Sequence, residues 1–253
     1  MLCKKALKEI FMVDLTRSKM TKFGYKEWEK YFSFNDSKRL NIDLSRESGL
    51  TGKEKRLIFP SIRAFQKGEG SDGAYLIKCS EKYGGAARRA VRLFVREENF
   101  HSAYLKKYMR HYDVKSVNIS VLDSIFRKLR KLGGFKCEVT VLVTAEMIAL
   151  TYYSALAECT DSPALKSICG QMLHDELKHI IFQSYNLSRT REGRLDAHLR
   201  YLLMDITSVA VWLAFGNVFR TGGYGFGRFM SENLGYLHQS VRMVNARRKT
   251  DPI

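Results

Sequence analysis

Hydrophobic residues recur at spacings of three and four along most of this chain, which is the pattern of amphipathic α-helices. The clearest case is residues 86–111, where the apolar residues from Ala90 to Tyr108 fall on one face. Alternating apolar and polar runs bounded by hairpin turns do not occur in the sequence, so a β architecture is not expected. The pattern therefore predicts an all-α protein.

Glycine and proline residues mark the expected ends of the helices. The first helix is predicted to start at Pro60, because proline suits the first helical turn, and to continue through three glycines between 68 and 73. The glycine-rich segment 221–227 lacks the lysine and hydroxyl residue of a phosphate loop, so we interpret it as a helix-ending turn. The predicted helices are residues 60–83, 86–111, 137–158, 163–185, 195–219 and a last one that ends at about 244.

The parts of the chain outside these helices are more polar. Residues 1–56 are predicted to be an N-terminal basic extension that packs on the helical bundle. Residues 57–246 are predicted to be the helical domain, with extra helices from about 195, and residues 247–253 a basic tail. The connection at 112–136 contains a basic amphipathic piece at 121–132.

Composition narrows the class of protein and its surroundings. The chain has 253 residues, of which 45% are hydrophobic, so it can bury one sizeable core. Its five cysteines are odd in number and form no CxxC pair, which favours a reducing cytoplasm over a disulfide framework. We predict no membrane span, because the apolar stretch 139–156 contains Glu146 and the stretch 207–219 is too short.

The net charge of +17 predicts anionic partners, such as a small anionic substrate or nucleic acid. The basic residues are spread along the chain, and the sequence contains no zinc finger or RNA-recognition motif. A solvated basic surface is therefore the preferred interpretation, with nucleic-acid binding as the alternative.

Two Glu-x-x-His motifs carry the candidate chemistry: Glu98-Asn-Phe-His101 and Glu176-Leu-Lys-His179. Positions i and i+3 lie on the same face of a helix, so a carboxylate and an imidazole at this spacing can bind one metal ion together. One such motif occurs easily by chance in a helix rich in glutamate, whereas two are more specific.

The spacing of two further glutamates strengthens the case. Glu69 lies 29 residues before Glu98, and Glu146 lies 30 residues before Glu176. Each half therefore predicts a helical hairpin that carries one glutamate and then a Glu-x-x-His motif. Two such hairpins supply four carboxylates and two imidazoles, which are the ligands of di-iron carboxylate bundles.

Two divalent cations would balance four buried carboxylates, which are costly without partners. For Glu146 alone, the alternative is an ion pair with a lysine or arginine from another helix. Glu98 and Glu176 are predicted to bridge or chelate the metals. The remaining ligands are Glu69, Glu146, His101 and His179. Carboxylate and imidazole ligands without thiolate favour a pair of iron ions, with manganese–iron or zinc as alternatives.

Neighbouring residues could orient the two imidazoles. Asp175 is predicted to accept a hydrogen bond from His101, and Glu97 from His179, with ordinary surface carboxylates as the alternative. Aromatic residues in the same register are interpreted as core packing, although one tyrosine could instead donate a hydrogen bond near the metals. They are Tyr75, Tyr104, Tyr152, Tyr153 and Phe182.

The chain resembles the ferritin-like superfamily over residues 60–185. The resemblance lies in GEG at 68–70, REENFH at 96–101, AEM at 145–147 and DELKH at 175–179, and extends to RTGGYGFGRF at 220–229. It implies a four-helix bundle with a di-metal centre. Members of this superfamily include ferroxidases, peroxide reductases and oxygenases acting on small molecules, lipids, quinones or tRNA.

Within that range we predict a di-iron, O2-activating oxidoreductase acting on a small, anionic organic substrate. The helices beyond 195 could cover a substrate pocket, and such an enzyme would be a monomer or homodimer. The alternatives are a ferroxidase, which would form a large shell, and a tRNA-modifying or nucleic-acid-binding protein. The sequence does not identify the electron donor or the substrate.

Overall fold

The computed structural model describes residues 12–47, 49–70, 73–117, 134–191, 193 and 195–251. All regular structure in these residues is helical, as predicted, and they contain no strand. The basic amphipathic piece predicted at 121–132 lies outside them. The helices are α1 (Tyr25–Asp36), α2 (Gly52–Glu69), α3 (Ala74–Ser80), α4 (Gly85–His111), α6 (Gly134–Glu158), α7 (Pro163–Ser188), α8 (Asp196–Thr221) and α9 (Phe226–Thr250).

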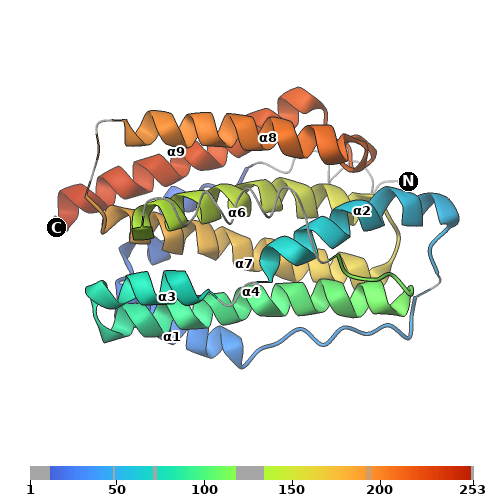
Figure 1. Cartoon of the computed structure of the whole chain (residues 1–253), viewed down its shortest axis with the longest axis horizontal. Helices are drawn as coiled ribbons and strands as arrows, with labels where there is room; N and C mark the ends of the chain where they lie inside the picture. The colour runs from blue at the N-terminus through green and yellow to red at the C-terminus, as the bar shows by residue number, and fades with distance from the viewer. Residues whose placement is uncertain are drawn as a thin grey trace.

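Helices α6 and α7 pack against each other along the middle of the molecule (Figure 1). On one side lie α4 and the pair α2 and α3, with α1 packed against the outer face of α4. On the other side, α8 packs on α6, and α9 packs on α7 and α8. The long central helices thus have neighbours on both sides, which explains why α6 is apolar nearly all round.

The first predicted helix differs from the prediction at both ends. Helix α2 begins at Gly52, eight residues before Pro60, because Thr51 and Glu54 form a capping box. It ends at Glu69 rather than continuing to residue 83. The chain resumes as α3 after Gly73, which has a positive φ of 58° and whose absent Cβ would lie 2.5 Å from Val95. Gly70 and Gly73 thus flank a break between two helices, whereas Gly68 is tolerated in the last turn of α2.

The N-terminal segment contributes to the core. Within the described part of residues 1–56, α1 buries Trp28 and Phe32 against α4 and α7. The Trp28 ring lies 5.2 Å from that of Phe182 on α7, and Phe32 lies 5.0 Å from the same ring. The aromatic spacing at 28, 31 and 32 is a helical signal within a segment whose basic composition suggested a surface role.

Helix α7 starts as the sequence predicts. The Ser162 hydroxyl accepts a hydrogen bond from the Leu165 backbone N–H at 3.0 Å, and Pro163 occupies the first helical position. At the other end of the chain, α9 continues through Thr250, six residues beyond the predicted end. Most of the described part of the predicted basic tail is therefore helical, and Arg247 in its last turn bonds the Lys22 carbonyl at 3.0 Å.

Two helices, α6 and α8, are long and apolar enough to cross a membrane by length and composition alone. The most apolar stretch of α6 is 78% buried inside the protein, as expected of a core helix. The corresponding stretch of α8 is only 39% buried, so α8 presents apolar side chains on the outside of the molecule.

The glycine-rich turn between α8 and α9 is a helix-ending turn, as interpreted from the sequence, and it packs tightly on α6. A Cβ added at Gly222 would lie 2.6 Å from the Ala155 Cα, which is backbone and cannot move aside. Gly222→Ala is therefore expected to lower the free energy of unfolding by about 3 kcal/mol, measured by urea denaturation. Gly227→Ala is the control, since a Cβ there meets open space within α9, and it should be neutral or slightly stabilising.

Candidate metal centre

Four helices carry the six predicted ligands, of which the structure brings Glu98, His101, Glu176 and His179 into one cluster. Glu69 is the last residue of α2, where the exposed carbonyls of a helix C-terminus favour a nearby cation. The i, i+3 spacing puts each Glu-x-x-His pair on one face of its helix. The other ligands come from α4 (Glu98 and His101), α6 (Glu146) and α7 (Glu176 and His179).

The two Glu-x-x-His motifs meet at the centre of the site. Glu98, His101, Glu176 and His179 each offer one ligand atom, and these atoms lie within 4.8 Å of one another. The Nδ1 atom of His101 is 3.4 Å from a Glu176 oxygen, and that of His179 is 2.9 Å from a Glu98 oxygen. Each imidazole therefore faces the carboxylate of the opposite motif as well as its own.

Both predicted orienting bonds are present, and they cross between α4 and α7. The Nε2 atom of His101 is 3.1 Å from Asp175, and Nε2 of His179 is 2.9 Å from Glu97. A carboxylate at Nε2 favours a proton there, which leaves each Nδ1 free to bind a cation. Since Asp175 and Glu97 directly precede the ligands Glu176 and Glu98, the arrangement repeats with approximate twofold symmetry.

Two contributing residues were missed at the sequence level. Asn35 of α1 donates hydrogen bonds to Glu97 and, at 3.4 Å, to Asp175, so α1 links the two orienting carboxylates. Nothing in the sequence near Asn35 signals this role. Gln183 donates to Glu146 at 3.5 Å, and it lies four residues after His179, so helical spacing could have revealed it.

The two outer glutamates flank this centre. Tyr153 donates a hydrogen bond to Glu69 at 2.7 Å, so this tyrosine both packs in the core and contacts a predicted ligand. Burial raises the pKa of Glu69 well above its ordinary value, and the negative charges of Glu98 and Glu176 raise it further. Burial and the same two charges also raise the pKa of Glu146, although His179 opposes the shift.

Several buried polar atoms of the site have no hydrogen-bond partner, which is uncommon in a folded protein. A cation would satisfy those of Glu98, His101, Glu176 and His179, because each of these residues offers a lone-pair donor to one common centre. Among the described residues, no lysine or arginine forms an ion pair with Glu146, so the alternative explanation of this buried carboxylate finds no support. The unpartnered atoms are Glu98 Oε1, Glu146 Oε2, Glu176 Oε2, His101 Nδ1 and His179 Nδ1.

The side of the centre formed by Glu69 and Glu98 is its least buried side. The Glu98 side chain is 15% exposed and Glu69 is partly buried, whereas the Glu176 side chain is 1% exposed. On the opposite side, aromatic rings enclose His179, with Phe94 at 4.8 Å and Phe32 at 6.1 Å. Small molecules would therefore approach between α2 and α4.

Metal binding is expected to release protons. Burial alone would lower the pKa of His101 and His179, but hydrogen bonds and neighbouring carboxylates raise both well above 6.5. The pKa values of Glu69 and Glu146 are also shifted upward, so without metal the site favours the protonated forms of these groups, whereas metal ligands must be deprotonated.

Affinity for a divalent cation should consequently fall as pH is lowered from 7.5 to 5.5, by roughly tenfold per pH unit for each proton displaced. Isothermal titration in two buffers of different ionisation enthalpy measures the protons released. An affinity independent of pH, with no protons released, would contradict the assignment.

Comparison with known proteins identifies no relative of this chain: no family model, curated protein or solved structure matches it. The resemblance to ferritin-like proteins thus remains a prediction, and the arguments for function rest on the geometry of the site.

Proposed function

We propose that this protein is a ferritin-like, di-iron oxidoreductase that activates O2 to oxidise a small organic substrate. The observation that carries the proposal is the pair of crossed Glu-x-x-His motifs, whose unpartnered ligand atoms converge inside four helices. When bound, a pair of ferrous ions would supply the electrons for reaction with O2. Glu98, His101, Glu176 and His179 would hold the ions, with Glu69 and Glu146 as the remaining carboxylate ligands.

The protein's own residues would hold the centre in a reactive arrangement. The bonds from Asp175 and Glu97 fix the two imidazoles, so that little movement is needed when metals bind. The aromatic rings of Phe32, Phe94 and Phe182 lie on the side of His179 and exclude water there. The partly exposed carboxylates Glu69 and Glu98 leave the opposite side for O2 and substrate.

The experiment is a metal titration followed by exposure to O2. Protein made metal-free and loaded anaerobically with ferrous iron should bind two ions per chain, by metal analysis. Oxygen uptake should then stop after a single oxidation of the bound iron and resume only with a chemical reductant. Binding of no more than trace metal would overturn the proposal.

The same experiment separates this function from iron handling. A ferroxidase would consume further O2 with every addition of ferrous iron beyond two per chain and would form a large shell on sizing. The surplus helices α8 and α9, which cover α6 and α7, favour a substrate enzyme over a storage shell.

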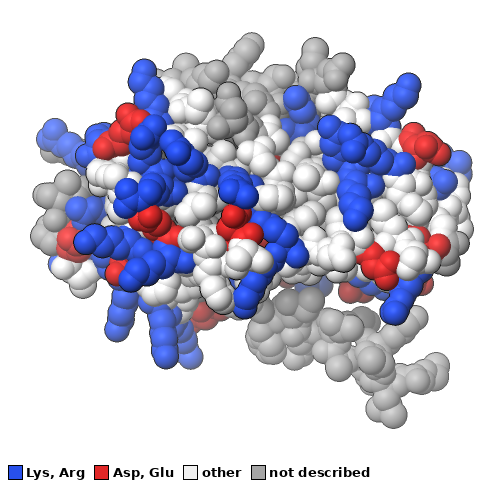
Figure 2. Space-filling model, turned by 90° about the horizontal axis from the view of Figure 1, so that it is seen from below, with Lys and Arg blue, Asp and Glu red and all other residues white. Residues whose placement is uncertain are grey.

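The nucleic-acid alternative gains no particular support from the charged surface. Figure 2 shows Lys and Arg interspersed with Asp and Glu over the face that contains α1 and α4. Several of these charges pair locally, as Arg89 does with Glu29 at 2.6 Å and Arg96 with Asp36 at 3.1 Å. The net charge of +17 would attract small anions and nucleic acids alike, so the proposal of a small substrate rests on the metal site and not on the charge.

A further inference from the structure

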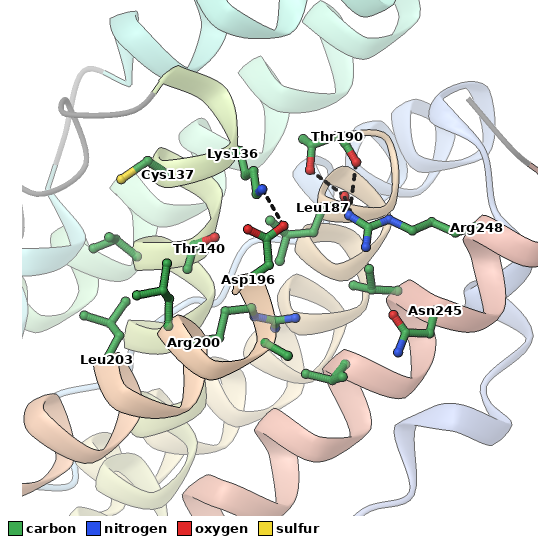
Figure 3. A pocket seen from close by; sticks show the side chains of 15 residues that line it. Lys136, Cys137, Thr140, Leu187, Thr190, Asp196, Arg200, Leu203, Asn245 and Arg248 are labelled. Atoms are coloured by element: carbon green, nitrogen blue, oxygen red, sulfur yellow. Dashed lines mark hydrogen bonds and ion pairs between the residues drawn. The ribbon is translucent and has the colours of Figure 1, made fainter. Parts of the chain in front are cut away.

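A cavity of about 410 Å³ lies between α6, α7, α8 and α9, away from the metal centre (Figure 3). Along the helices, its lining residues Val141 and Leu187 lie roughly 8 to 12 Å from the nearest Glu146 and His179, at 1.5 Å per residue. The volume suits a small ligand, since ligand pockets span roughly 300–1,000 Å³. The walls are mainly aliphatic: Val141, Leu187, Leu199, Leu203, Val241 and Val244.

One buried cation in this cavity forms no ion pair among the described residues, although the negative charge of Asp196, four residues earlier on the same helix, acts on it. Arg200 is 7% exposed, and its guanidinium donates to the Ser240 hydroxyl at 2.6 Å, while its Nε has no hydrogen-bond partner. Within the described part of the chain, no carboxylate forms an ion pair with it. Burial lowers the pKa of Arg200 to about 10, so the side chain remains charged at neutral pH. A buried charge without a partner is costly, which makes a ligand anion the natural complement.

The other charged groups of the cavity already have partners. Lys136 pairs with Asp196 and also donates to the Arg191 carbonyl at 3.2 Å. Arg248 donates to the Leu187 and Thr190 carbonyls, at 3.3 and 3.0 Å, and so caps the C-terminal end of α7. Figure 3 marks the Lys136–Asp196 ion pair and the Arg248 hydrogen bonds and draws Arg200 among the lining side chains. The lining residues therefore include three cations and one anion, and the anion, Asp196, pairs with Lys136 rather than with Arg200.

We propose that this cavity binds an aliphatic monocarboxylate, with the carboxylate on Arg200 and the hydrocarbon chain along the leucine and valine walls. A guanidinium offers a planar pair of donors that matches a carboxylate, and the apolar lining requires a ligand with little other polarity. This inference does not depend on the metal centre, because the two sites share none of their residues.

Titration calorimetry with decanoate, decanol and decyltrimethylammonium tests the headgroup. Decanoate should bind, and decanol should bind at least tenfold more weakly because it cannot neutralise the guanidinium. Arg200→Met should weaken decanoate binding by roughly 10- to 100-fold, whereas Arg242→Met, an exposed arginine of α9, should leave it unchanged. Equal binding of decanol and decanoate, or an unchanged Arg200→Met variant, would overturn the proposal.

If Arg200→Met does not fold, a second variant still tests the proposal. Val241→Phe fills the cavity from α9 while Arg200 remains in place. It should abolish decanoate binding while the metal content stays at the wild-type value. Retained decanoate binding in this variant would show that the acid binds elsewhere and would likewise overturn the proposal.

Helix α8 and its N-cap residue Leu195 carry a second feature, a stripe of exposed apolar residues at alternating spacings of four and three, of which Leu199 also lines the cavity. This is the heptad spacing with which one helix packs along another. Such large exposed side chains in one row mark an interaction surface rather than a chance pattern. The stripe consists of Leu195, Leu199, Leu202, Ile206, Val209 and Leu213, which are 64, 58, 55, 60, 40 and 80% exposed.

We infer that the partner is a second copy of this chain, packed through α8. An anionic membrane is the less suitable occupant, because the exposed residues described between 195 and 217 include no lysine or arginine. Six side chains exposing roughly 100 Å² each would bury about 1,200 Å² in a symmetric dimer, which is enough for a small stable interface.

Sedimentation velocity at increasing protein concentration tests the dimer. Wild-type protein should dimerise, and Ile206→Glu should shift the dissociation constant at least 100-fold toward monomer without changing the metal content. Phe34→Glu on α1 is the matched control, since Phe34 is also 60% exposed. A protein that stays monomeric at all concentrations would overturn this inference. The inference would also fail if the monomer co-sedimented with lipid vesicles instead of dimerising.

Discussion

Glu176→Gln is expected to reduce bound iron from two ions per chain to fewer than one and to abolish O2 uptake by the reconstituted protein. Glu176 lies 3.4 Å from each imidazole Nδ1, and its side chain is 1% exposed against 15% for Glu98, the other carboxylate that contacts both rings. The substitution preserves size and replaces an anionic ligand by a neutral amide, which divalent iron binds poorly.

This variant should still fold. Without metal, Glu176 is one of several buried carboxylates that repel one another, so the amide removes a charge that raises the pKa of Glu69 and Glu146. Metal analysis and circular dichroism of the same preparation measure both properties. Glu158→Gln, an exposed glutamate of α6, is the control and should retain both ions. If the folded Glu176→Gln variant still bound two ions tightly, the assignment of Glu176 as a metal ligand would be wrong.

Asp175→Asn is expected to weaken metal binding by about 10- to 100-fold while the fold is retained. Asp175 accepts hydrogen bonds from His101 and, at 2.8 Å, from Gln171, and these interactions hold its pKa well below the usual range despite burial. An asparagine can occupy the same space, but it is neutral and supports the protonated Nε2 of His101 less strongly. The imidazole is then a poorer and less well oriented ligand.

Because the site is approximately symmetric, we expect a loss of metal affinity of the same size from the equivalent substitution on α4. Glu97→Gln should weaken metal binding because it disturbs His179, just as Asp175→Asn disturbs His101. The double variant should lose more metal affinity than either single variant. Competition with a chelator of known affinity measures each loss. Asp161→Asn, fully exposed just before α7, is the control. If Asp175→Asn binds iron like the control, the bond to His101 is structural only.

Local sequence was sufficient to predict much of the helical framework. The cap at Ser162 and the proline after it placed the start of α7, because capping depends on neighbouring residues alone. The prediction was wrong at α2, where Pro60 suggested a start and the capping box of Thr51 and Glu54 provides one eight residues earlier. The prediction that one helix continues through the glycines up to residue 73 was also wrong. Gly73 is required because Val95 of another helix approaches it closely, which the local sequence does not show.

Periodicity alone was sufficient to place Glu98 with His101 and Glu176 with His179 on single helix faces, since the i, i+3 geometry is local. Only the tertiary structure decided that these faces meet, that the orienting bonds cross between α4 and α7, and that Asn35 joins them from α1. The isolation of Arg200 in its cavity is likewise invisible in the sequence. Contacts between distant residues depend on how helices pack, which no local pattern encodes.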